Sequence, residues 1–252
     1  MTEIWQGFDR AATHYDQLTP LQQQSAIQLL QRLGTVPPNQ VWMDAGCGTG
    51  RLAKALAAQH VRVWAVDRAL AMLQPLRSLE NIQIICTDLR ELPMPDEMLD
   101  GMVSNFALHW LGVSVLPELL RVVRPSGELH LAIPVSGSLS AVHARYPDLP
   151  IFNFASAQAW IDAAGDALVA ANQQVFRQPY ADLRALLTAL KHMGGAQLAA
   201  DQAHVSAMQL RQWLRDPEPI ELDYQVLFLH LKKPTATDGF SQWLQQVQRR
   251  EG

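Results

Sequence analysis

The sequence is poor in the features that mark several classes of protein. It has only 2 cysteines in 252 residues, and charged residues make up 17% of the chain. So few cysteines exclude a disulfide-rich secreted scaffold, and an apolar content of 48% excludes a disordered chain. No apolar run approaches the ~20 residues of a membrane-spanning helix, and residues 1–10 lack the basic-then-apolar order of a signal peptide. We therefore expect a soluble protein in the cytoplasm that makes no membrane contact.

An excess of positive charge is also missing. The chain has 20 Lys and Arg against 24 Asp and Glu, a net charge of -4. Because nucleic-acid binders normally show a basic excess or stripe, we expect no nucleic-acid partner. Cys47 and Cys86 lie in apolar, strand-like segments without a CxxC spacing or neighbouring histidines, so we expect reduced core thiols and no bound metal.

Strands and helices alternate through the first half of the chain. Two amphipathic helices are expected first, one with its apolar stripe from Ile4 to Tyr15 and one from Ala26 to Leu33, and consecutive prolines at 37 and 38 end them. Apolar strand segments then occur at 41–44, 61–66, 82–86, 99–104 and 128–133, with helical segments at 52–59, 69–77 and 113–123 and a turn at 124–127. This order predicts a parallel, doubly wound α/β sheet.

The pattern changes after residue 134. Residues 136–173 are mostly helical and aromatic and show no clear strand, so we expect a helical insertion or lid there. A strand at 174–178, helices at 182–193 and 206–215, and a long apolar strand at 220–233 are expected to complete the sheet.

A glycine-rich loop follows the first strand directly. Its sequence is Asp44-Ala45-Gly46-Cys47-Gly48-Thr49-Gly50, and a helix begins at once. Alternate glycines let the backbone turn tightly and approach a ligand closely. Position 51 is Arg, where the nicotinamide fingerprint Gly-x-Gly-x-x-Gly has a small residue. The pattern therefore favours a nucleoside without a pyrophosphate.

Polar residues end the next three strands of the predicted sheet. Asp67 stands where an acidic side chain binds ribose hydroxyls in doubly wound sheets, and Asp88 with Leu89 is placed to meet an adenine ring. Asn105 and Phe106 follow the fourth strand, at the crevice where ligands bind.

Together these residues resemble the class I S-adenosylmethionine-dependent methyltransferases over residues 41–134. The resemblance implies a Rossmann-like, seven-stranded sheet with a reversed last strand and S-adenosyl-L-methionine as cofactor. It also implies a division into an N-terminal helical cap (1–36), the cofactor-binding core (37–134), the helical lid insertion (135–173) and the C-terminal part of the core sheet (174–252). The implied cofactor-binding residues are Asp44, Gly46, Cys47, Gly48, Gly50, Asp67, Arg68, Met72, Asp88, Leu89, Asn105, Phe106, His109 and Trp110.

Further segments are similar to the malonyl-[acyl-carrier protein] O-methyltransferase family. They are Phe8-Asp9-Arg10-Ala11-Ala12 with Tyr15, Leu21-Gln22-Gln23-Gln24-Ser25, Ser104-Asn105-Phe106-Ala107-Leu108-His109-Trp110, Ser136-Gly137-Ser138-Leu139 and Leu190-Lys191-His192-Met193-Gly194. That family commonly has Gln at the position of His109. The resemblance implies methylation of the free carboxylate of malonyl-acyl-carrier protein or malonyl-CoA, a methyl ester that primes pimeloyl synthesis for biotin, and an acyl-carrier protein as partner.

The acceptor end of such a site has three candidate residues. A carboxylate is ionised at pH 7 and needs no general base to accept a methyl group, so the protein has to position it and exclude water. Tyr15 could hold the cofactor or the acceptor through its hydroxyl, and Lys191 or Arg145 could bind the malonyl carboxylate. Tyr15 could instead be a core aromatic residue, and a Lys or Arg at positions such as 191 and 145 is more often a solvated surface charge.

Three alternatives remain at the level of sequence. The chain could methylate another small carboxylate or a ring hydroxyl, or it could be a non-catalytic S-adenosylmethionine-binding module that regulates a partner. A nicotinamide oxidoreductase is disfavoured by Arg51 and the missing pyrophosphate fingerprint.

Overall fold

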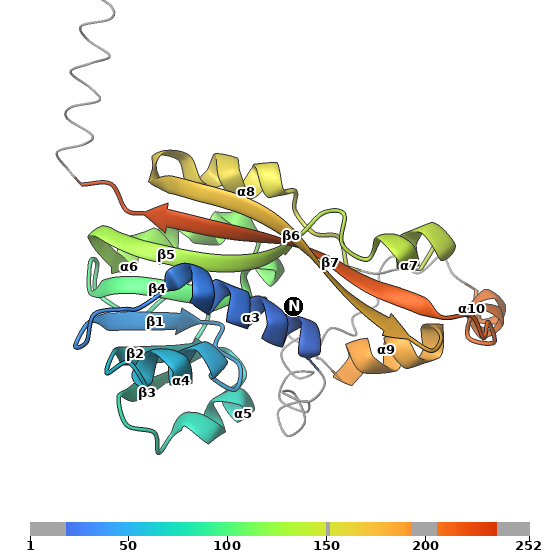
Figure 1. Ribbon diagram of the computed structural model, residues 1–252, viewed down its shortest axis with the longest axis horizontal. Helices are drawn as coiled ribbons and strands as arrows, with labels where there is room; N and C mark the ends of the chain where they lie inside the picture. Colours follow the sequence, from blue (N-terminus) through green and yellow to red (C-terminus); the bar gives the residue numbers. More distant parts are fainter. Residues whose placement is uncertain (1–18, 150–151, 193–205, 236–252) are drawn as a thin grey trace, which may run out of the picture.

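The computed structural model describes residues 19–149, 152–192 and 206–235, which form one seven-stranded sheet with helices on both faces (Figure 1). The strand order is β3-β2-β1-β4-β5-β7-β6. The strands are β1 (Val41–Ala45), β2 (Arg62–Asp67), β3 (Ile82–Cys86), β4 (Leu99–Asn105), β5 (Val123–Val135), β6 (Leu168–Tyr180) and β7 (Ile220–Lys232).

The predicted α/β topology is confirmed. β3, β2, β1, β4 and β5 are parallel, and β7 runs antiparallel between β5 and β6. β7 is buried along most of its length, because helices cover both faces of the sheet at this position, and this explains its nearly continuous apolar sequence. The reversed strand therefore lies inside the sheet, and β6 forms the edge.

Helices cover the sheet in two layers. Leu29 of α3 and Leu56 of α4 belong to the core on one face, and Leu119 of α6 and Trp160 of α8 belong to the core on the other. None of the helices in the described ranges combines the length and apolar character needed to cross a bilayer. The helices are α3 (Pro20–Leu33), α4 (Arg51–Ala57), α5 (Leu70–Leu73), α6 (Leu116–Val122), α7 (Ser140–Arg145), α8 (Ala157–Ala164), α9 (Leu183–His192) and α10 (Ala207–Trp213).

The first described helix, α3, confirms the second predicted N-terminal helix. Pro20 occupies its first turn, where the missing N–H costs nothing, and Gly34 ends it with a φ of 72°. Leu21 and Leu29 are buried against the sheet, so α3 crosses the strands as part of the core (Figure 1). The expected helix from Ile4 to Tyr15 lies outside the described residues.

Two strands begin earlier than the sequence predicts. β6 starts at Leu168, six residues inside the segment expected to be helical, and it pairs with β7 from end to end. β5 starts at Val123 and includes the expected turn at 124–127, where Ser126 has a φ of 62°. Residues 124–127 have no partners in the ladder with β4, whose register shifts there, so the expected turn is kept as an irregularity within β5. In the early part of β6, by contrast, backbone pairing with β7 overrides a weak strand propensity.

The helices of the predicted insertion pack onto the sheet. Trp160 of α8 is completely buried in the core beneath β5 and β7, and Val142 of α7 is buried against β7. As Figure 1 shows, β6 and β7 continue past the other strands toward α7, α9 and α10. The boundaries of the four proposed segments remain a prediction.

The two cysteines do not behave alike. Cys86 ends β3 with an exposed side chain, which corrects the expectation of a core thiol, because β3 is an edge strand with one open side. Cys47 lies half-buried in the glycine loop, and burial is the main cause that raises the pKa of its thiol. Neither cysteine forms a disulfide bond.

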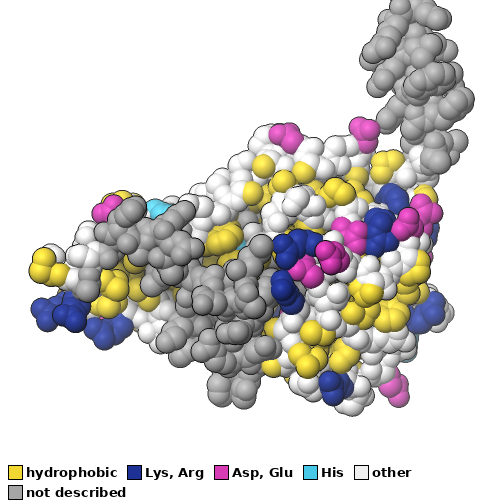
Figure 2. All heavy atoms as spheres, turned by 180° about the vertical axis from the view of Figure 1, so that it is seen from behind, with side chains coloured by type: hydrophobic (Ala, Val, Ile, Leu, Met, Phe, Trp, Pro, Cys, Tyr) yellow, Lys and Arg dark blue, Asp and Glu magenta, His cyan; other side chains and the backbone are white. Residues whose placement is uncertain are grey.

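An arginine holds the connection between β3 and β4, which contains no helix. The Arg121 guanidinium of α6 donates hydrogen bonds to the backbone carbonyls of Met94 and Leu92, and it pairs with Glu118 and Asp96 at 2.7 Å each. On the side of the molecule shown in Figure 2, oppositely charged side chains alternate in a row. Such mixed charge agrees with the modest net charge of the chain.

Candidate functional site

The glycine loop joins β1 to α4 in a backbone conformation that glycine favours. Gly46, Gly48 and Gly50 have φ angles of 71°, 52° and 79°, in the left-handed region. A Cβ on Gly46 would collide with Ala107, and a Cβ on Gly50 would collide with the Leu76 side chain. The alternate glycines therefore let the loop pack tightly against its neighbours at the carboxyl end of the sheet.

Asp67, at the end of β2, ties this loop to the start of α5. One of its carboxylate oxygens accepts a hydrogen bond from the Gly48 N–H at 2.9 Å, and the other accepts one from the Ala69 N–H at 2.8 Å. The same carboxylate lines the pocket at the strand ends.

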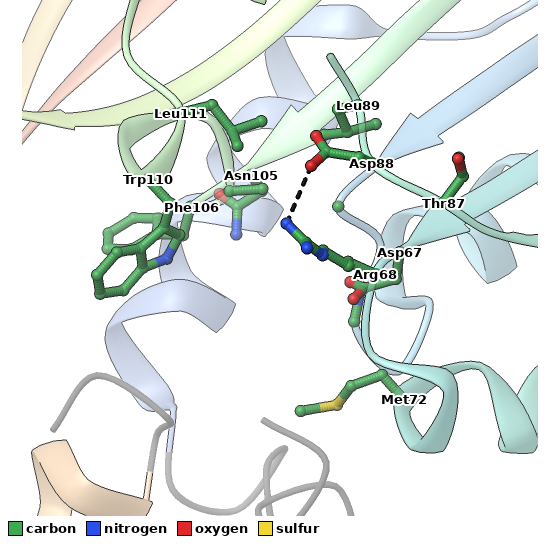
Figure 3. A pocket seen from close by; sticks show the side chains of 13 residues that line it. Asp67, Arg68, Met72, Thr87, Asp88, Leu89, Asn105, Phe106, Trp110 and Leu111 are labelled. Carbon is green, nitrogen blue, oxygen red and sulfur yellow. Dashed lines mark hydrogen bonds and ion pairs between the residues drawn. The ribbon is translucent and has the colours of Figure 1, made fainter. Parts of the chain in front are cut away.

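A pocket of about 600 Å³, including its open mouth, lies at the carboxyl ends of β1 to β4 (Figure 3). Carboxylates line one side, and Phe106 and Trp110 lie opposite Arg68 and Met72. Ten of the predicted cofactor residues meet here: Gly46, Gly48, Asp67, Arg68, Met72, Asp88, Leu89, Asn105, Phe106 and Trp110. The strand ends converge in this way because parallel strands end at the same edge of a sheet.

Three lining residues were missed by the sequence analysis. They are Thr87, Ala107 and Leu111. Thr87 and Ala107 each adjoin a predicted residue at a strand end, so a wider window around each end would have found them. Leu111 directly follows the predicted residue Trp110, at the end of a 3-10 turn at Leu108–Trp110, so the same wider window would have included it.

Asp88 lines the pocket, but its carboxylate is paired with two arginines. Its carboxylate lies 2.6 Å from Arg90 and 3.0 Å from Arg68, the contact drawn in Figure 3. The hydrogen bonds with Arg90 are the main cause that lowers the pKa of Asp88. Since the two oxygens already accept four hydrogen bonds, an adenine amino group at this carboxylate would have to replace one of them.

A second hollow lies on the α3 side of the glycine loop. Predicted residues Asp44 and Cys47 line it together with Gln22, Thr49 and Arg51, and it shares Gly46, Gly48 and Asn105 with the pocket. Asp44 is buried and accepts a hydrogen bond from the Ala53 N–H at 2.9 Å. Burial is the main cause that raises the pKa of Asp44 from 3.8 to about 7.

Asn105 fastens α3 to the end of β4. Its amide oxygen accepts a hydrogen bond from the Ser25 hydroxyl at 2.7 Å, and its amide nitrogen donates to the Gln22 carbonyl at 3.1 Å. The side chain therefore fixes the helix over the glycine loop as well as lining the pocket.

His109 lies behind the pocket wall and does not line it. Its ring packs against Trp110 at a centroid distance of 4.6 Å and against Phe152 and Phe154 at 5.8 and 5.5 Å. His109 is half-buried, with its Nδ1 enclosed, and loss of solvent around the ring lowers the pKa of His109 to about 3, so the imidazole is neutral near pH 7. This cluster brings aromatic residues of the predicted insertion against a residue of the pocket wall.

The remaining predicted site residues lie elsewhere. Gly50 does not line the pocket; it lets the loop pass Leu76. Arg145 of α7 pairs with Asp216 at 2.6 Å and is absent from the pocket lining. Tyr15 and the side chain of Lys191 lie outside the described residues, so their roles remain predictions.

Comparisons with known proteins find methyltransferases. A family model described as a methyltransferase domain matches residues 43–131. The chain is 31% identical to a malonyl-[acyl-carrier protein] O-methyltransferase of Herminiimonas arsenicoxydans, over 92% of this chain and 96% of the relative. It is 32% identical to the protein of that name from Alcanivorax borkumensis, over 91% of this chain and 86% of the relative.

Solved structures share the fold at lower identity. The YcgJ protein of Bacillus subtilis superposes with a TM-score of 0.60 and 17% identity, covering 84% of this chain and 99% of that one. A geranyl diphosphate methyltransferase in complex with SAM superposes with a TM-score of 0.51 and 18% identity, covering 82% and 84%. With about one third of its residues identical to those of these curated relatives along nearly its full length, the chain belongs to the malonyl-[acyl-carrier protein] O-methyltransferase family.

Proposed function

We propose that this chain transfers a methyl group from S-adenosylmethionine to the free carboxylate of a malonyl group carried by acyl-carrier protein. The product would be a malonyl methyl ester, whose hidden charge lets fatty-acid synthesis extend it toward a pimeloyl thioester for biotin. The observation that carries the proposal is the pocket at the strand ends, where the glycine loop and Asp67 meet, in a chain of this family.

The residues of the pocket fit the proposed cofactor. Gly46 and Gly48 bring backbone close to the pocket without side chains, and Asp67 places a carboxylate in the pocket at the strand end where ribose hydroxyls bind in doubly wound sheets. Leu89 and Phe106 offer apolar surface for a purine ring. S-adenosylmethionine supplies a methyl group already activated by a positively charged sulfur, and the aromatic faces beside the pocket suit a cation.

Methylation of a carboxylate requires the protein to position the acceptor and to exclude water, and it requires no proton transfer. A carboxylate is ionised at pH 7, so no general base has to activate it. The neutral His109 agrees with this, because it packs behind the pocket wall and does not line the pocket where it could exchange protons. Attack in line with the bond that breaks needs only that the two reactants be held together.

Closure and acceptor binding are assigned to segments that border the pocket. We infer that residues 1–36 act as a cap and that the stretch around Phe152 and Phe154, within the predicted insertion 135–173, acts as a lid, supported by the contacts of α3 with Asn105 and of these two rings with His109. Of the two cations considered for the malonyl carboxylate, Arg145 is already paired with Asp216. This favours Lys191, and Tyr15 remains the candidate for a hydroxyl contact.

The test is mass spectrometry of malonyl-acyl-carrier protein incubated with the enzyme and S-adenosylmethionine. A gain of one methyl group on the malonyl form, with no gain on acetyl-acyl-carrier protein, is expected, because the acetyl form lacks the acceptor carboxylate. Malonyl-CoA in a parallel reaction separates recognition of the carrier from recognition of the malonyl group. Cofactor binding without methylation of any of these acceptors would contradict the proposal.

The same assay tests the acceptor contact. Lys191→Ala is expected to raise the KM for the malonyl carrier while leaving the affinity for S-adenosylmethionine unchanged. Unchanged kinetics would remove Lys191 from the acceptor site without affecting the assignment of the reaction.

A further inference from the structure

Two strands bring a glutamate and two histidines together away from the glycine loop. His130 of β5 stands directly opposite His230 of β7 in the antiparallel pair, and Glu128 lies two residues before His130. Because side chains at positions i and i+2 of a strand share a face, all three project from the same side of the sheet. The cavity beside them shares no lining residue with the pocket or the second hollow.

We propose that Glu128, His130 and His230 form a binding site for a divalent transition-metal ion, for which Zn²⁺ is the ion best suited. We call these three residues the strand-pair cluster. The site would clamp β5 to β7 on the face covered by α3, and it is independent of the proposed methyl transfer.

The spacing of the candidate ligand atoms matches that around a metal ion. Glu128 Oε2 lies 3.2 Å from His130 Nε2 and 3.4 Å from His230 Nε2, and one ligand atom from each residue lies within 4.8 Å of the others. Two ligand atoms ~2.0–2.1 Å from a zinc ion at a tetrahedral angle are separated by ~3.3 Å. The three side chains could therefore close on an ion with little movement.

The His230 ring carries an unsatisfied nitrogen at this point. His230 Nε2 is buried and has no hydrogen-bond partner of suitable geometry, although Glu128 lies near it. A buried polar atom without a partner is costly, and coordination of a cation would remove that cost. The two imidazole rings stack at a centroid distance of 4.2 Å. The Nε2 atoms of both rings lie near the same carboxylate oxygen, that of Glu128.

The donor types select the class of ion. Two imidazole nitrogens and one carboxylate suit Zn²⁺ and other divalent transition-metal ions, whereas Ca²⁺ and Mg²⁺ prefer six or more oxygen ligands. The adjacent cavity, lined by Leu29 and Asn172 among others, leaves room for water to complete the coordination. Arg32 also lines that cavity, but its guanidinium lies over the Phe228 ring at 4.4 Å. Its charge would weaken binding without filling the site.

The test is titration of the untagged, full-length protein with Zn²⁺ in competition with a chromophoric chelator. Saturable binding of one ion by the wild type is expected, with affinity reduced at least about tenfold in Glu128→Gln and in His230→Gln. Glu128→Gln keeps the size of the side chain and removes its charge. His60→Asn and Cys86→Ser, which alter an exposed histidine and an exposed thiol outside the cluster, are the matched controls and should leave this affinity unchanged.

Thermal unfolding provides a second readout. Zn²⁺ should raise the Tm of the wild type, because a ligand that binds only the folded state stabilises it, and the rise should disappear in Glu128→Gln. A variant that merely lost folded stability would instead show a lower Tm in the absence of metal. No saturable binding by the wild type, or equal binding by wild type, Glu128→Gln and His230→Gln, would overturn the proposal.

Discussion

Replacing Asp67 by Asn should weaken cofactor binding more than any other conservative change in the pocket. The substitution keeps the shape of the side chain but turns one acceptor oxygen into an NH₂ group. That group would then face the backbone N–H of Gly48 or of Ala69, which now donate to the two carboxylate oxygens at 2.9 and 2.8 Å. One of the two hydrogen bonds from these backbone N–H groups is then lost, and the new NH₂ group and the backbone N–H face each other as two donors.

The size of the effect follows from the hydrogen bonds involved. A hydrogen bond to a charged group contributes about 1.5–3 kcal/mol, and each 1.4 kcal/mol changes a dissociation constant about tenfold. The loss of one such contact with a ribose hydroxyl therefore predicts a Kd for S-adenosylmethionine that rises about 10–100-fold. The loosened glycine loop should also lower the free energy of unfolding by about 1–3 kcal/mol.

Isothermal titration calorimetry measures the first effect and urea denaturation the second. The matched control is Asp96→Asn, which removes the same charge from an exposed side chain that pairs with Arg121 on the surface. Its Kd should equal that of the wild type. If Asp67→Asn folds and binds S-adenosylmethionine as tightly as the control does, Asp67 does not hold the cofactor and the reasoning is wrong.

Three further changes test the surroundings of the pocket. Gly50→Ala should lower the free energy of unfolding by about 1–3 kcal/mol in urea titrations. Gly50 has a left-handed backbone conformation, and a Cβ at this position would collide with the Leu76 side chain. A free energy of unfolding equal to that of the wild type would contradict the packing described. Burial raises the pKa of Asp44 from 3.8 to about 7, so the folded state binds more protons than the unfolded state between those values. Relative to Asp44→Asn, the ligand-free wild type should therefore lose stability as the pH rises from about 4 to about 7, and parallel stability curves would exclude the raised pKa. Because burial keeps His109 neutral above a pKa of about 3, His109→Gln should leave the shape of the pH–rate profile between pH 5.5 and 8 unchanged; loss of an inflection would show that the imidazole titrates during turnover.

The glycine loop and the strand-end acids could be predicted because their requirements are local. Gly46 and Gly48 adopt left-handed φ angles that few other residues tolerate, and Asp67 is fixed in place by following a buried parallel strand. Once the strands were recognised from their apolar runs, the rule that parallel strands end at one edge brought these residues together. The fourteen cofactor residues were implied by the family resemblance, and ten of them line one pocket.

The contacts that modify this site depend on partners distant in sequence. Arg68 donates a hydrogen bond to Asp88, which is 20 residues away along the chain, and Arg145 donates one to Asp216, which is 71 residues away. No local sequence pattern distinguishes these arginines from solvated surface charges. The first half of β6 escaped prediction because its residues are mostly exposed and carry little apolar alternation. This segment is a strand because its backbone pairs with that of β7.

The amino-acid sequence by itself determined the doubly wound sheet, the glycine loop and the family to which the chain belongs, since each rests on residue types at short, fixed spacings. Only the tertiary structure decided that His109 lies behind the pocket wall instead of lining the pocket, and that Glu128 and His130 meet His230. The last of these contacts joins strands separated by about a hundred residues of chain, whose register is set by backbone hydrogen bonding rather than by the side chains it brings together.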